Sequence, residues 1–82
     1  MARDIHGGVL GAGMSAGLVG LAGATQSAVK HACQLMVLLN RELRAHGQYA
    51  IADDVTEMLQ DALETCKKSL MVRETVEKRF NA

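Results

Sequence analysis

Between residues 26 and 46, the order of apolar and polar positions follows the period of an α-helix. Apolar side chains recur there at intervals of three and four residues, at Val29, Ala32, Met36, Leu39 and Leu43. The apolar stripe is broadened beyond one face by Cys33, Leu35, Val37 and Leu38. A helix that is apolar over more than one face needs more than one neighbour. The pattern therefore predicts a helix over about 26–46 that packs against two other helices.

End signals place a second helix after a short turn. Arg44 lies in the last turn of the first helix, where a cation favours the negative end of the helix dipole. Gly47 follows as the C-terminal stop. Asp53 stands at the beginning of the next stretch and Arg79 at its end, an order that also suits a helix dipole. These charges predict a helix over about 51–80.

The two predicted helices match each other level by level when they run antiparallel. With a turn near residue 49, residues whose numbers sum to about 98 or 99 lie at one level, and both sides of each level are apolar. The expected pairs are Val29–Leu70, Cys33–Cys66, Met36 with Ala62 or Leu63, Leu39–Leu59 and Leu43–Val55. Charges also complement, with Arg41 opposite Glu57 and Arg44 opposite Asp54. We predict an all-α fold whose centre is an antiparallel two-helix hairpin over 26–82.

Residues 1–25 form a different, glycine-rich segment, which holds seven of the eight glycines and has no formal charge after Asp4 if His6 is neutral. Each interior glycine disfavours a helix by about 1 kcal/mol relative to alanine, so this stretch should not form a helix alone in water. Its spacing is nevertheless regular, because a seam of small residues follows Gly13, Gly17, Gly20 and Ala24. An apolar stripe runs beside the seam through Leu10, Met14, Leu18 and Leu21. Such a seam lets another helix approach closely, so we predict an additional, packed helical segment.

Other interpretations of this segment remain open. A flexible tail would be richer in polar residues than in Val, Leu and Met. A membrane span over residues 7–29 has the length, but its glycines lower its hydrophobicity. A secretory signal could use Ala22-Gly23-Ala24 as its cleavage site, although Asp4 cancels Arg3 and glycines interrupt the apolar region.

A chain of 82 residues buries a smaller fraction of its surface on folding than a larger protein does, so a hairpin of this size needs stabilisation from disulfides, a metal or association. The C-terminal residues strengthen this expectation, because they lie beyond the levels that the first helix covers from Val29 onward. They are Leu70, Val72, Val76 and Phe80. Their partner would be the N-terminal segment, turned back along them, or a neighbouring molecule. We expect a homo-oligomer or a complex with a larger protein.

Charge and chemistry add few candidates. Nine basic and nine acidic residues balance, so no net field attracts nucleic acid or anionic lipid. The acidic run from Asp53 to Glu64 is typical of a solvated helix face. Cys33 and Cys66 are best interpreted as core residues, and His31 alone is weak evidence for a site. No residue pattern predicts a catalytic, metal or cofactor site, and no motif assigns the chain to a family.

The sequence thus favours a non-enzymatic helical subunit for protein–protein interaction or self-assembly, located in the cytoplasm or within a protein assembly. Its contacts would be the small-residue seam with its leucine stripe and the apolar C-terminal surface. The alternatives are a small membrane protein anchored by residues 7–29 and, less favoured, an RNA-binding helical bundle that uses Lys67 and Lys68.

Overall fold

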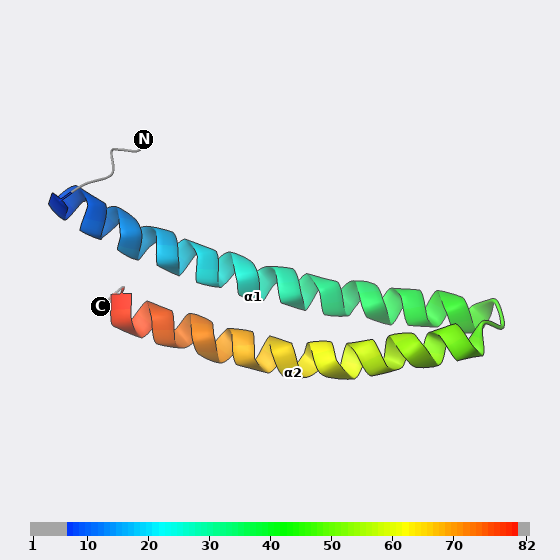
Figure 1. Ribbon diagram of the computed structural model, residues 1–82. Coiled ribbons are helices and arrows are strands. Elements are labelled where there is room, and N and C mark those ends of the chain that lie inside the picture. Colours follow the sequence, from blue (N-terminus) through cyan, green and yellow to red (C-terminus); the bar gives the residue numbers. More distant parts are fainter. Residues whose placement is uncertain (1–6, 81–82) are drawn as a thin grey trace.

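The fold is an antiparallel hairpin of two long helices, as the computed structural model shows (Figure 1). The structure describes the backbone of residues 7–80 and the side chains of residues 16–80. Helix α1 comprises Gly7–Ala45 and helix α2 comprises Tyr49–Phe80, and no strand occurs within residues 7–80. The predicted all-α hairpin is confirmed. Helix α2 begins two residues earlier than the charge pattern indicated and ends where it was expected.

The turn is built around Gly47, as the sequence predicted. This glycine has a φ of 74°, a left-handed conformation that side-chain-bearing residues rarely adopt. The amide of Gln48 donates to the carbonyl of Leu43 at 2.8 Å, and the amide of Gly47 donates to that of Arg44 at 3.1 Å. These two bonds form the Schellman pattern, which satisfies the last carbonyls of α1. Helix α2 can then start at once, with the amide of Ala52 donating to the carbonyl of Gln48.

The glycine-rich segment is continuous with the first helix instead of folding back on it. Helix α1 runs without interruption through residue 25, where the sequence suggested a boundary. It therefore reaches the end of α2 by extension: the side chain of Gln26 accepts a hydrogen bond from Arg73 at 3.2 Å. The hairpin measures 58 × 26 × 13 Å, which corresponds to one layer of two helices. No third element within residues 7–80 covers either broad side of this layer.

The two helices meet along a narrow line of side chains, which we call the inner seam. All its members are buried or half-buried, and they recur at alternating intervals of three and four residues, as in a coiled coil. On α1 they are Val19, Ala22, Gln26, Val29, Cys33, Met36, Asn40 and Leu43. On α2 they are Ala52, Val55, Leu59, Ala62, Cys66, Ser69, Arg73 and Val76. The seam therefore combines aliphatic side chains with small and polar ones.

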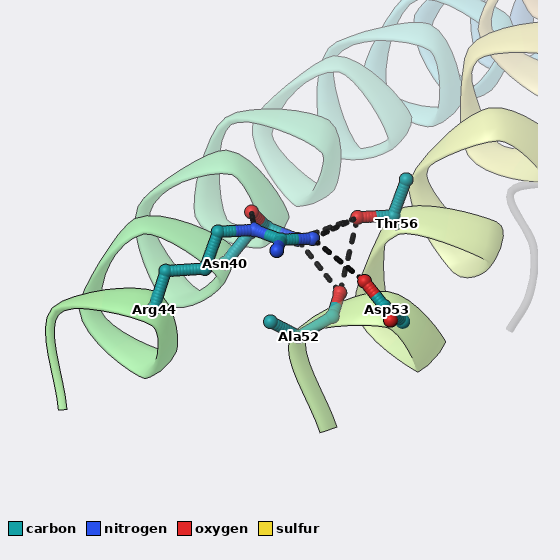
Figure 2. Close-up of polar contacts among 5 residues, drawn as sticks. All are labelled: Asn40, Arg44, Ala52, Asp53 and Thr56. Carbon is teal, nitrogen blue, oxygen red and sulfur yellow. Dashed lines mark hydrogen bonds and ion pairs between the residues drawn. The ribbon is translucent and has the colours of Figure 1, made fainter. Parts of the chain in front are cut away.

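Polar groups fix the register of the seam near the turn (Figure 2). Asn40 donates from Nδ2 to the carbonyl of Ala52 at 2.8 Å and to Thr56 Oγ1 at 2.7 Å. Arg44 donates from Nε to Asn40 Oδ1 at 2.9 Å and from Nη2 to Asp53 Oδ1 at 3.0 Å. A polar residue inside a helix contact favours the one register in which its partners are met. Asn40 therefore holds the two helices at one level.

Three details of the expected pairing are wrong. Val29 was expected to face Leu70, but Leu70 is 43% exposed and Ser69 is the buried residue of the seam. Leu39 was expected to face Leu59, but its side chain is 49% exposed, and Asn40 occupies the inner seam instead. Arg44 pairs with Asp53 and not with Asp54. The general register is confirmed, because the contacts at Asn40–Thr56, Arg44–Asp53 and Gln26–Arg73 all lie within a few residues of the expected levels.

Candidate functional site

Large apolar side chains lie mainly on the outside of the hairpin. Fourteen of them, among the described residues, are 39% to 68% exposed, whereas the buried hydrophobic residues are only Cys33, Ala52 and Val55. Single exposed leucines are ordinary on protein surfaces, but contiguous apolar patches mark places where another surface binds. The candidate site of this chain is therefore a surface, and the question is where the exposed residues gather.

Seven residues of α1 form a second line, which we call the outer stripe. They repeat the alternating three- and four-residue spacing of the inner seam, and they lie about 100° round the helix from it. In chain order they are Leu18, Leu21, Thr25, Ala28, Ala32, Leu35 and Leu39. All are exposed except Ala32, which is half-buried, and none carries a charge. Helix α1 thus presents two coiled-coil seams, of which α2 covers one.

Helix α2 adds apolar side chains on the same side of the hairpin. Arg44 and Thr56, which bond to each other, each directly follow a seam residue, so they mark one flank of the contact. Residues that directly precede Asn40 on α1 and Ala52 on α2 therefore lie on the opposite flank. On α2 this flank carries Ile51, Met58 and Val72, which are 51% to 57% exposed, and between them the exposed charged residues Asp54, Asp61 and Lys68. The outer stripe and these three apolar residues together form what we call the outer face.

The small-residue seam predicted from the sequence faces open space. A Cβ atom added at Gly17 or Gly20 would meet no atom within 4 Å, and Ala24 is exposed. Helix α2 therefore does not use these glycines for close approach. Leu18 and Leu21, from the neighbouring predicted stripe, are exposed and belong to the outer stripe. The other predicted contacts of this segment, Leu10, Gly13 and Met14, lie outside the side chains that the structure describes.

The residues of the predicted C-terminal surface do not lie together. Val76 is half-buried in the inner seam. Leu70, Val72 and Phe80 are 43%, 57% and 41% exposed. Val72 belongs to the outer face, whereas Leu70 follows the seam residue Ser69 and lies on the opposite flank.

That opposite flank holds a shallow depression of about 470 Å³. Leu63, Cys66 and Leu70 form its apolar wall, and Gln26, Glu64 and Lys67 are among its polar lining residues. Cys66 is half-buried and Cys33 is buried, and both are free thiols, in agreement with their interpretation as seam residues. The depression is smaller in extent than the outer face, so it is a weaker candidate for a protein contact.

Sequence reasoning missed parts of this arrangement. Asn40 and Arg73 were not recognised as seam residues, and Thr56 was not recognised as the partner of Asn40, because an apolar neighbour was favoured at each level. Leu39 was assigned to the contact with the second helix, whereas its side chain is 49% exposed, and Leu35 was assigned to a broadened stripe and not recognised as a member of a second line with Leu39. Their unbroken spacing with Leu18 and Leu21 was the available signal.

Polar chemistry is sparse across the part of the chain that the structure describes. The acidic run from Asp53 to Glu64 has every carboxylate exposed, and His31 is exposed as well. No group of three or more His, Cys, Asp or Glu side chains within the described residues could hold a metal ion. Neither of the described helices combines the length and apolarity that crossing a bilayer requires.

Comparison with known proteins gives no relative from which a role could be transferred. No family model, no curated protein and no solved structure matches this chain.

Proposed function

We propose that this chain is a non-enzymatic helical subunit that acts through protein–protein association, with the outer face as its contact. The observation that carries the proposal is the exposure of the apolar side chains. The four leucines of the outer stripe are 39% to 68% exposed, while the inner seam combines aliphatic side chains with small and polar ones. Full burial of one leucine stabilises a protein by about 1.5–3 kcal/mol, so much of this stabilisation is available to a partner.

The size of the hairpin supports the same proposal. A single layer of two helices cannot enclose a core, and a chain of 82 residues is usually completed by association when it lacks disulfides or a metal. Four-helix arrangements are a common solution, because they bury two faces of every helix. The role follows from this incompleteness: the chain is a building block or an adaptor, active when its outer face is covered.

The test combines a measurement of mass with a measurement of apolar exposure on the full chain at micromolar concentration. Sedimentation equilibrium gives the mass, and the fluorescence of an apolar dye such as anilinonaphthalene sulfonate reports an open apolar face. A mass above the 8.8 kDa of one chain supports the proposal, as does a monomer that binds the dye. A helical monomer that binds no dye would contradict it, since its apolar residues would then be covered within one chain.

A further inference from the structure

The outer stripe has the same order of large and small side chains in both directions along α1. Two leucines stand at each end, Leu18 with Leu21 and Leu35 with Leu39. Between them lie only the smaller Thr25, Ala28 and Ala32. A helix face with this order is complementary in shape to an antiparallel copy of itself, because large residues meet large ones at both ends and small residues meet small ones in the centre.

From this order we infer that the outer face binds a second copy of this chain, with the two α1 helices antiparallel about a twofold axis near Ala28. The inference rests on the proposed function and names its partner. Residues whose numbers add to 56 or 57 then lie level in the two copies. Leu18 packs against Leu39 of the second copy, Leu21 against its Leu35, and Ala28 against its Ala28.

The position of the stripe fits a four-helix bundle. In such a bundle each helix contacts two neighbours at roughly right angles around its axis. The inner seam and the outer stripe are separated by about 100° on α1, so α2 and the second α1 occupy these two directions. The small residues around Ala28 let the two α1 backbones approach closely at the centre. Met58 and Val72 of α2 lie on the same side and enlarge the contact.

The helix dipoles favour the antiparallel arrangement over a parallel one. Two antiparallel α1 helices place the positive end of one dipole beside the negative end of the other, whereas two parallel helices would place like ends together.

The available area is close to what a stable dimer needs. The stripe from Leu18 to Leu39 is roughly 32 Å long at 1.5 Å per residue, and the face of two helices is about 20 Å wide. The product is roughly 640 Å² per copy, against about 800 Å² per partner in a standard stable interface.

Cysteine cross-linking tests both the partner and its direction. Cys33 and Cys66 are first replaced by alanine, and Leu18→Cys and Leu39→Cys are made as separate single-cysteine chains. The chains are oxidised alone and after mixing under conditions that allow subunits to exchange. Glu57→Cys serves as the control that should not cross-link, because position 57 lies on the side of α2 that faces away from α1. If the alanine replacements reduce helix content, a photoreactive residue at position 18 of the native-cysteine chain gives the same information by mapping its adduct.

An antiparallel pair predicts a Leu18→Cys to Leu39→Cys disulfide that exceeds both self-cross-links, and an adduct near residue 39 in the photochemical version. Self-cross-linking of Leu18→Cys and of Leu39→Cys would overturn the direction, because it indicates a parallel pair. A monomer that still binds apolar dye would overturn the second copy as partner and leave the proposed function standing. A monomer that binds no dye would overturn both.

Discussion

The inner seam and the outer stripe of α1 both carry large aliphatic side chains, but only the inner seam is covered. The inner seam combines Val19, Val29, Met36 and Leu43 with the polar Gln26 and Asn40, and all of them are half-buried against α2. The leucines of the outer stripe remain 39% to 68% exposed. Burial of apolar side chains is the main favourable contribution to folding, so the hairpin uses only one of the two apolar lines of α1 for its own stability.

Breaking the inner seam should have the largest effect on folding. Val55 is 4% exposed, so Val55→Asp places an unpaired charge between the helices and should lower the free energy of unfolding by about 3 kcal/mol or more. Ile51→Asp, on the outer face, is the matched control. Chemical denaturation at several protein concentrations separates them: the loss in Val55→Asp should not depend on concentration, whereas the loss in Ile51→Asp should. Equal losses in both variants would mean that the two surfaces do not differ in role.

Removing the polar register contact should have a smaller effect. Asn40→Ala leaves Thr56 and Arg44 without a shared partner and should cost about 1–2 kcal/mol of unfolding free energy. Gln34→Ala, an exposed position on the same helix, should change it by less than about 0.5 kcal/mol. Urea denaturation followed by circular dichroism measures both. A loss in Asn40→Ala no greater than in Gln34→Ala would show that this network does not hold the seam.

Two glycines should respond in opposite directions to the same substitution. Gly47 has a φ of 74°, so Gly47→Ala strains the turn and should destabilise the hairpin by about 1 kcal/mol. Gly20 lies within α1 with open space where a Cβ would stand, so Gly20→Ala should stabilise by about 0.5–1 kcal/mol. Thermal denaturation of the two variants should shift the midpoint down and up respectively. Destabilisation by Gly20→Ala would indicate that something packs closely against this glycine.

The smallest effect is expected at the ion pair beside the turn. Arg44 Nη2 and Asp53 Oδ1 are 3.0 Å apart, but the two side chains are 40% and 70% exposed. Asp53→Asn should therefore lower the free energy of unfolding by at most about 1 kcal/mol, and added salt should reduce the difference from the native chain. Denaturation at low and high ionic strength tests this. A large loss of unfolding free energy that does not depend on salt would mean that this ion pair contributes more to the register of the two helices than its solvent exposure indicates.

The spacing of apolar residues and the residues at the helix ends predicted the hairpin, because its turn and approximate register depend on short stretches of sequence. Gly47 and the dipole-matched charges mark the helix ends wherever they occur. The choice of seam could not be predicted, because α1 has two stripes with the same spacing on adjacent faces. Leu39 was favoured over Asn40 since apolar residues usually face inward. The hydrogen bonds of Asn40 to Ala52 and Thr56 on α2 show which of the two lines faces α2, and these bonds can be seen only in the structure.

The N-terminal half of α1 shows a second limit of prediction. Its glycines oppose a helix, yet the helix continues to Gly7. Helix propensity is a weak prior that tertiary contact overrides, and α2 supplies that contact at least as far as Gln26, which bonds to Arg73. The length of α2 was known from the sequence, but which stretch would lie along its end was not.

The most direct test of the account compares two lysine substitutions at neighbouring exposed positions of α1. Leu35→Lys places a charge in the outer stripe, and Gln34→Lys places the same charge outside it. Light scattering at about 50 µM should give the native chain and Gln34→Lys a mass of twice 8.8 kDa and Leu35→Lys a mass near 8.8 kDa, because a buried unpaired charge at each copy's Leu35 raises the dissociation constant by roughly 100-fold or more. Equal masses for the two variants would contradict the outer face as the site of association.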